Sequence, residues 1–313
     1  MQSYEYYEEK RQKTWKKLRF WGEHIAGMEF AGTRLLSGKE GNDKIKDLLL
    51  SGKPVTISRF GKTEMDPVTY RELGRTDPAL KESVDREIGN CSGFFPCTSD
   101  MIDRYREVLI ESISDIDFMG IWFFIENEEY MIDKYMNKPI CALPKSLDPE
   151  YYKHPWSYAL KGKKVLVINP FVDTIRHQYE NYREHIYKNP EMLPEYELKT
   201  LKAVQTLADE RDPRFSNWFE ALDWMKEEIE KIDFDIALLG CGAYGIPLQH
   251  HIKSLGKSSV YIGGGAQVMY GITGRRWDNN KYVNKWKNEY WTRPGQHEQI
   301  ASYKKVEMGG PYW

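Results

Sequence analysis

The strongest constraint on the fold is a series of short, almost continuously apolar runs that alternate with segments of helical periodicity. The clearest runs are KVLVI at residues 164–168, DIALL at 235–239 and SVYI at 259–262. Strands that are apolar on both sides are typical of parallel sheets with both faces covered. The pattern therefore predicts an α/β fold with a mostly parallel sheet and helices on both faces.

The same pattern divides the chain into three segments. Residues 51–278 form the predicted α/β domain, which begins with a β-branched run at 54–58. Residues 1–50 are predicted as a helical appendage, because Trp15, Leu18, Trp21 and Ile25 recur on one helical stripe. Residues 279–313 are rich in aromatic and polar side chains without clear periodicity, and we expect them to form a tail that wraps over the domain.

Composition excludes several classes of protein. The formal net charge is −2, with 45 Lys and Arg against 47 Asp and Glu, so the chain has no overall field to attract nucleic acid or an anionic membrane. No apolar run approaches the roughly 20 residues of a membrane span, and the charged start lacks the apolar region of a secretory signal. We therefore expect a cytoplasmic protein with a local anion site, and its oligomeric state stays open.

The residues GCGAYG at 240–245 lie between an apolar run and a helical segment. Gly240, Gly242 and Gly245 match the G-x-G-x-x-G spacing of nucleotide-binding turns, where glycines permit a tight turn and keep Cβ atoms away from the ligand. Free N–H groups at the start of the helix attract a phosphate. The alternative is a tight strand-to-helix turn that binds nothing.

A second glycine turn follows the next apolar run, at residues 263–265. Successive parallel strands end at the same edge of a sheet, which is where ligands bind in open α/β folds. We therefore expect Gly263 and Gly264 to face the first turn across a crevice, with Gln267 in a short helix behind them.

Two guanidinium groups and an indole follow this turn. Arg275 and Arg276 are candidates for binding phosphate oxygens, because each guanidinium can donate two parallel hydrogen bonds. Trp277 is a candidate for stacking on a ring of the ligand. The alternative for the arginines is a pair of solvated surface charges.

The glycine turns do not fit two common nucleotide sites. A nicotinamide-dinucleotide site needs Asp or Glu after the next strand, but residues 261–263 are Tyr, Ile and Gly. The Lys-Ser/Thr ending of a P-loop is also missing. The sequence thus predicts neither NAD binding nor ATP or GTP hydrolysis, and a methyltransferase site ranks lower because it too needs an acidic residue after the second strand.

A polar segment, SRFGKTE at 58–64, follows the first apolar run of the domain. If the strands are parallel, this segment opens on the same edge as the glycine turns. Arg59 could then bind a phosphate, and Glu64 could act as a metal ligand or a general base. The alternative is a salt bridge between Arg59 and Glu64 at the start of a helix.

The block at 235–277, together with ISRFGKTE at 57–64, resembles bacterial proteins that carry the GT-D type glycosyltransferase fold. The resemblance covers about residues 50–278. It implies a Rossmann-like fold, a nucleoside-diphosphate sugar donor and a glycan acceptor, in the synthesis of bacterial surface polysaccharide. Such relatives have an Asp-x-Glu motif after Arg-Phe/Tyr-Gly, and this motif binds a divalent metal at the sugar diphosphate.

This chain departs from the family at that motif, which reads Lys62-Thr63-Glu64. One carboxylate beside an ammonium is a poor site for Mg²⁺ or Mn²⁺, which need several hard oxygen ligands. Either Lys62 itself neutralises the leaving diphosphate, or the domain binds a nucleotide or glycan without catalysis. Both hypotheses stay open at this point.

The resemblance also supplies candidates for the substrate. Asp173 and Gln178, after the KVLVI run, could contact sugar or acceptor hydroxyls, although Asp173 is also placed to cap the helix that follows. The complete set of candidates consists of catalytic, nucleotide-binding and substrate residues. The catalytic candidates are Arg59, Lys62 and Glu64; the nucleotide-binding ones are Gly61, Gly240, Gly242, Gly245, Gly263, Gly264, Gln267, Arg275 and Arg276; the substrate ones are Asp173, Gln178 and Trp277.

Overall fold

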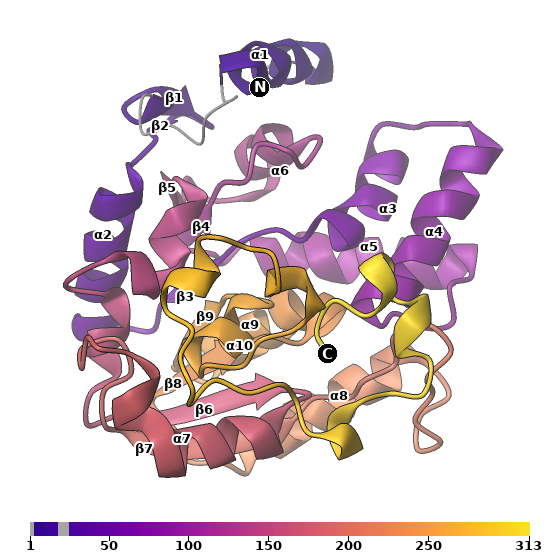
Figure 1. The fold of residues 1–313 in the computed structure, drawn as a ribbon. Helices are drawn as coiled ribbons and strands as arrows, with labels where there is room; N and C mark the ends of the chain where they lie inside the picture. Colours follow the sequence, from indigo (N-terminus) through magenta and orange to yellow (C-terminus); the bar gives the residue numbers. More distant parts are fainter. Residues whose placement is uncertain (1–2, 18–24) are drawn as a thin grey trace.

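The computed structural model describes residues 3–17 and 25–313 and is built around a seven-stranded parallel sheet (Figure 1). In spatial order its strands are β5 (Ile140–Ala142), β4 (Phe118–Gly120), β3 (Thr56–Ser58), β9 (Ser258–Tyr261), β8 (Ile236–Leu239), β6 (Lys164–Asn169) and β7 (Glu197–Lys202). Every pair of neighbours is parallel. The α/β fold with a mostly parallel sheet is therefore confirmed.

Both faces of the sheet are buried, and strand β6 contributes side chains to the hydrophobic core on each face. Leu166 and Ile168 belong to one hydrophobic core, whereas Val165 and Val167 belong to the other. All four are fully buried, which contributes about 1.5–3 kcal/mol for each side chain. Because successive side chains point to opposite faces, a strand between two helical layers must be apolar throughout. This is the physical origin of the KVLVI run.

Helices cover both faces of this sheet. The first core is shared with α1 (Tyr4–Lys17), α3 (Lys62–Glu72), α4 (Pro78–Ser92), α5 (Ser99–Ile113), α6 (Glu128–Tyr135), α8 (Trp218–Glu230) and α9 (Gly245–Ser254). The second is shared with α2 (Gly38–Leu50), α7 (Val172–Ile186) and α10 (Gly265–Met269). Short 3-10 turns are η2 (Pro144–Leu147), η3 (Pro149–Tyr151), η4 (Trp156–Leu160), η5 (Gly242–Tyr244), η6 (Arg275–Trp277), η7 (Val283–Lys285), η8 (Gln296–Glu298), η9 (Tyr303–Lys305) and η10 (Glu307–Gly309).

The amino-terminal segment is less uniformly helical than its sequence predicts. A two-stranded hairpin, β1 (Glu29–Phe30) and β2 (Thr33–Arg34), separates α1 from α2, so the helical prediction is wrong there. Leu18, Trp21 and the side chain of Trp15 lie outside the described residues. Helix α2 is also not an appendage, because Ile45 and Leu49 are buried against the sheet. Where the domains divide stays a prediction.

Helix α3 is longer and more regular than its sequence suggests. Pro67 lies inside this helix, where its ring removes one backbone donor and is usually unfavourable. Tertiary packing offsets that cost, since Met65 and Val68 are buried in the core. The consequence for the site is large, because Lys62 to Glu64 form the first turn of a helix.

The carboxyl-terminal tail crosses the sheet edge, and Figure 1 shows it in yellow over the region of α9 and α10. It is anchored at its end, where Trp313 is 7% exposed and its Nε1 donates to the carbonyl oxygen of Glu298 at 3.2 Å. The main chain of Arg275 also donates to the carbonyl oxygen of Trp313 at 3.0 Å. No helix in the described ranges is both long enough and apolar enough to cross a membrane.

Candidate functional site

A cleft of about 530 Å³ lies at the carboxyl ends of the parallel strands. Arg59 follows β3, Gly240 follows β8 and Gly263 follows β9, and all three line it. These strands are neighbours in the sheet, in the order β3-β9-β8. The topology thus brings together the polar segment and the two glycine turns, as their positions after apolar runs predicted.

The glycines of the two turns are needed for close packing of the chain against itself. A Cβ at Gly263, where φ is +53°, would lie 2.0 Å from Nη2 of Arg59. A Cβ at Gly240 would lie 2.6 Å from the carbonyl oxygen of Gly263, and one at Gly245 would lie 2.5 Å from the ring of Tyr261. A ligand role for these glycines stays a prediction; only Gly240 and Gly263 of the three also line the cleft.

The first glycine turn is held from behind by aromatic stacking. Tyr244 is buried, and its ring stacks on Trp218 of α8 with centroids 5.0 Å apart and planes at 13°. Gly242, the turn residue that lines the cleft beside them, has φ +58°. A Cβ there would lie 2.6 Å from the carbonyl oxygen of Ser92. The turn is therefore a rigid wall of the cleft.

Arg59 is half-buried in the cleft near two aromatic rings. Its guanidinium carbon lies 5.2 Å from the ring centroid of Trp122 and 5.8 Å from that of Tyr261. Over residues 3–17 and 25–313 it forms no ion pair, so the expected alternative of a salt bridge to Glu64 is not formed. An arginine whose charge has no carboxylate partner is suited to an anionic ligand.

Helix α3 directs its amino end into the same cleft. Its N-cap is Gly61, which offers no side-chain acceptor to the first N–H groups. Gly61, Lys62, Thr63 and Glu64 all line the cleft. Free N–H groups and the helix dipole together favour an anion at such a position. This amino end of α3 lies two residues after Arg59.

The side chains of this first turn do not fit a divalent metal. Lys62 forms an ion pair with Asp66 on the same helix, so the carboxylate of Asp66 is neutralised by an ammonium. Glu64 accepts a hydrogen bond from the Thr63 hydroxyl at 3.1 Å, and its carboxylate lies over the space that a Cβ of Gly61 would fill. One carboxylate so placed does not supply the oxygen set of Mg²⁺ or Mn²⁺.

Two acidic residues in the cleft escaped the sequence analysis. Asp148 and Glu150 follow β5 and are half-buried on the cleft wall. Burial raises the pKa of Asp148 to about 6, against the opposing charges of Arg59 and Lys145. Burial and the neighbouring Asp148 hold the pKa of Glu150 well above its usual range. Their position after the apolar run at 139–143 was the available signal, because all parallel strands end at one edge.

The tail brings a carboxylate to one of the two predicted arginines. Arg276 lines the cleft, forms an ion pair with Glu307 and lies with its guanidinium carbon 5.0 Å from the ring centroid of Tyr312. Arg275 is exposed outside the cleft, where it donates to the carbonyl oxygen of Gly309 at 3.2 Å. Of the pair only Arg276 lines the cleft, and a ligand role for either arginine stays a prediction.

The other nucleotide candidates behind the second glycine turn are nearly buried. Gln267 is 1% exposed and donates through Nε2 to the carbonyl oxygen of Tyr312 at 3.0 Å. Trp277 is 7% exposed, and its ring lies 3.5 Å from the position that a Cβ of Gly264 would take. Trp277, the candidate for stacking on a ligand ring, clusters with Val268 and Val283 and also lines the cleft, so stacking on a ligand stays a prediction.

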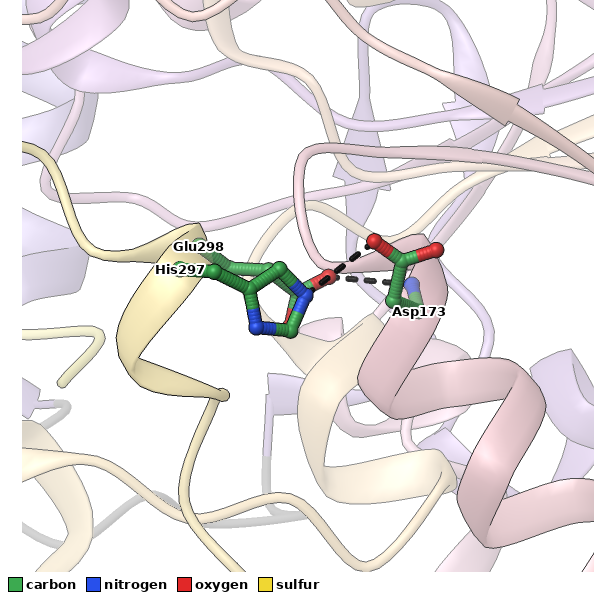
Figure 2. Close-up of side chains that lie close together, drawn as sticks. All are labelled: Asp173, His297 and Glu298. Atoms are coloured by element: carbon green, nitrogen blue, oxygen red, sulfur yellow. Dashed lines mark hydrogen bonds and ion pairs between the residues drawn. The ribbon is translucent and has the colours of Figure 1, made fainter.

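The two substrate candidates on α7 lie outside the cleft. Gln178 is 1% exposed, and its Nε2 donates to the carbonyl oxygen of Tyr290 at 2.8 Å. The carboxylate of Asp173 is exposed and faces Nε2 of His297 at 3.2 Å (Figure 2). Neither is the N-cap of α7, which is Phe171. We therefore assign both residues to packing of the tail, in place of the sugar contact or cap expected from the sequence.

Ligand atoms of Asp173, His297 and Glu298 lie within 4.8 Å of one another, as a metal site would require. Figure 2 shows His297 and Glu298 reaching from the tail to the start of α7. Glu298 is buried and accepts hydrogen bonds from the N–H of Asp173 at 2.9 Å and that of Gly295 at 3.3 Å, and from the Thr174 hydroxyl. A carboxylate surrounded by donors at the positive end of a helix is a capping group, and it disfavours a cation.

The loop that carries Trp122 into the cleft is held by one buried acid. Glu128 is 1% exposed and accepts hydrogen bonds from the N–H groups of Trp122 at 3.1 Å and Phe123 at 2.8 Å. Burial raises the pKa of Glu128 from its ordinary value of 4.5 to about 8, although these hydrogen bonds oppose the shift. The uncharged acid is therefore the form that the folded protein favours below pH 8.

Glu128→Gln is expected to flatten the pH dependence of folding stability. The carboxyl group of Glu128 has a pKa of about 8 in the folded protein and an ordinary pKa of 4.5 in the unfolded chain. Its contribution to stability is therefore complete below pH 4.5 and is lost as the pH rises to about 8. Between pH 5 and pH 8 the decline in the free energy of unfolding should be smaller in the variant by on the order of 3 kcal/mol. Urea unfolding at pH 5 and pH 8 measures this decline. The control is Glu82→Gln, which changes an exposed glutamate. Parallel declines in Glu128→Gln and the parent would contradict the assignment.

No protein-family model and no curated protein matches the chain. Two solved structures have a similar fold. A selenomethionine-substituted structure of domain of unknown function 1792 is 11% identical with a TM-score of 0.43, over 92% of each chain. A second structure is described as showing that this domain has a distinct glycosyltransferase fold; it is 12% identical with a TM-score of 0.42, over 88% of this chain and 94% of that chain. The likeness is one of fold alone.

Proposed function

We propose that this protein is a glycosyltransferase whose cleft binds a nucleoside-diphosphate sugar. The observation that carries the proposal is that Arg59, which forms no ion pair among the described residues, lies next to the amino end of α3, in a cleft at the carboxyl edge of a parallel sheet. A diphosphate is the anion that matches two adjacent donors of this kind. Aromatic rings beside Arg59 provide a flat, largely apolar wall for a base or a sugar.

In this proposal the protein stabilises charge on the leaving group. The acceptor hydroxyl attacks the anomeric carbon, and the bond from that carbon to the diphosphate oxygen breaks, so that the electron pair leaves with the diphosphate. Arg59 and the N–H groups of α3 neutralise the charge that develops there, which is commonly the largest single contribution to such rates. Arg276 adds a second cation once the donor competes with Glu307 for it.

The acceptor proton requires a base, and Asp148 is the best placed. Its pKa of about 6 lies near neutrality, so the carboxylate is mostly ionised at pH 7 yet basic enough to take a proton. Glu64 was the base expected from the sequence, but its carboxylate is folded back over Gly61. We derive no step through Mg²⁺ or Mn²⁺, because the residues at the motif do not fit one. A surface-polysaccharide acceptor and a cytoplasmic location stay predictions from the sequence.

A second candidate function is binding of a nucleotide or glycan without catalysis. Two observations favour it: Lys62 replaces the family's first carboxylate and is paired with Asp66, and Glu307 already holds Arg276. Both would weaken a catalytic donor site. The two functions differ in turnover and not in binding, so an experiment must measure both.

Nucleoside diphosphates should bind the full chain and raise its melting temperature, and a nucleotide sugar should be hydrolysed or transferred slowly. The test is a calorimetric titration with UDP, GDP, ADP and their sugars, with and without Mn²⁺, followed by measurement of released nucleotide. Asp148→Asn should abolish turnover while binding is kept, and turnover of the parent should fall as the pH drops through about 6.

Matched outcomes separate the alternatives. Loss of turnover in Glu64→Gln with an active Asp148→Asn would move the base back to Glu64. Tight binding without turnover of any sugar would establish the binding protein. Failure of every nucleotide to bind would overturn the donor site itself.

A further inference from the structure

A group of lysines surrounds one exposed tyrosine at the rim of the cleft. Nζ of Lys281 lies 5.3 Å from the ring centroid of Tyr282, Nζ of Lys285 lies at 5.6 Å and Nζ of Lys145 at 5.8 Å. The Lys145 ammonium also lies 5.2 Å from the ring centroid of Tyr151, which lines the cleft. We call Lys145, Lys281 and Lys285 the lysine rim.

The lysine rim has no direct carboxylate partner among the described residues. None of the three forms an ion pair in the described ranges, whereas Lys62 and Arg276 in the cleft each form one. Lys281 and Lys285 are exposed, and Tyr282 between them is 43% exposed. Three ammonium groups gathered around one ring repel one another, and an anion bound among them would offset that repulsion.

The rim is continuous with the part of the cleft where the acceptor must lie. Asn280 and Val283 line the cleft on either side of Tyr282 in the sequence. Lys145 is near enough to Asp148 for its charge to oppose the raised pKa of that acid. A molecule whose hydroxyl is in contact with Asp148 would therefore extend its neighbouring groups towards these lysines.

We infer that the acceptor carries an anionic group, a carboxylate or a phosphate, which the lysine rim binds beside the exposed ring of Tyr282. The inference rests on the proposed function, because it takes Asp148 as the end of the acceptor subsite. A sugar ring stacks on an aromatic face, and an ammonium on either side then reaches its charged substituent. The rim would select an acidic acceptor over a neutral one of the same shape.

The test uses the full chain with its lysines reductively methylated with ¹³C, so that each dimethylammonium group gives its own nuclear magnetic resonance signal. Lys145→Gln, Lys281→Gln and Lys285→Gln assign the three rim signals. Three probes of matched shape are titrated: methyl glucoside, methyl glucuronoside and methyl glucoside 6-phosphate. The rim signals should shift with both charged probes and stay unchanged with the neutral one, and the tighter of the two identifies the anion.

The double variant Lys281→Gln/Lys285→Gln should weaken binding of the charged probe at least three-fold. Its matched control is Lys53→Gln/Lys161→Gln, which removes two exposed lysines that come just before β3 and β6, at the amino-terminal edge of the sheet. Equal loss in both variants, or equal shifts of all lysine signals, would overturn the inference by showing a general charge effect.

Binding of UDP and GDP to the same variants distinguishes this inference from the donor site. If nucleotide binds normally and the rim signals do not respond to either charged probe, the acidic acceptor is refuted while the donor proposal stands. If the rim responds and no nucleotide binds, the donor proposal fails and the rim stands as an anionic-glycan site.

Discussion

Arg59→Met is expected to weaken binding of a nucleoside diphosphate by about 10- to 150-fold. A hydrogen bond to a charged group contributes about 1.5–3 kcal/mol, and this guanidinium forms no direct ion pair with a carboxylate among the described residues. Methionine keeps only the unbranched apolar stem, so the change removes the guanidinium together with its charge, its donors and its contacts with the rings of Trp122 and Tyr261. Turnover of a nucleotide sugar should fall by at least as much, because charge on the diphosphate increases as it leaves.

Calorimetric titration with the nucleotide that binds the parent protein measures the effect. Arg275→Met is the matched control, because Arg275 follows the second glycine turn but lies outside the cleft, where it contacts the carbonyl oxygen of Gly309. Arg59→Lys should recover part of the affinity and not all of it, since an ammonium cannot donate two parallel hydrogen bonds. A nucleotide that binds Arg59→Met as tightly as the parent would place the diphosphate elsewhere.

The carboxyl edge of the sheet, where the cleft lies, could be predicted from the sequence because local patterns determine which residues lie there. Apolar runs of strand length, each followed by glycine or a polar residue, determine the strands and their direction, and parallel strands share one edge. Arg59 and Gly263 could therefore be placed together from their positions in the sequence alone. The same rule, applied to the strand at 139–143, would have added Asp148 to the site.

Other parts of the site depend on contacts that no local pattern encodes. Helix α3 contains Pro67, a residue that favours a break, and only its burial against the core shows that packing outweighs the local preference. Glu307 reaches Arg276 from the tail, 31 residues along the chain, in a segment without periodicity. Glu298 caps α7 from 124 residues away, so a search for a cap near Asp173 could not find it.

The glycine turn at 240–245 shows where motif logic and packing differ. The G-x-G-x-x-G pattern predicted its position between β8 and α9, and the structure has it there. The motif suggests that these glycines leave room for a ligand. In the structure the space beside Gly240 is filled by Gly263 and that beside Gly245 by Tyr261, so these glycines are needed for close packing of the chain. A motif of this kind can thus persist for packing, and substitutions in it test stability first.

Gly242→Ala should therefore lower the free energy of unfolding by about 2–5 kcal/mol. Its φ of +58° costs a residue with a Cβ about 1–2 kcal/mol, and the new Cβ would lie 2.6 Å from the carbonyl oxygen of Ser92. That oxygen is backbone, so it cannot rotate away, and such overpacking costs about 1–3 kcal/mol more. Ser92 itself is 2% exposed at the end of α4, which leaves the backbone there little room to shift.

Gly256→Ala is the matched control, because Gly256 has φ +74° and nothing within 4 Å of the position of its Cβ. Urea unfolding should show that Gly256→Ala loses about 1–2 kcal/mol of the free energy of unfolding. The further loss of about 1–3 kcal/mol in Gly242→Ala then measures the clash with Ser92 alone. Equal losses would mean that the turn can move away from Ser92, and the rigid wall assigned to the cleft would be wrong. Because Gly242 lines the cleft and Gly256 does not, a loss of nucleotide affinity confined to the first variant would show that ligand binding depends on this wall.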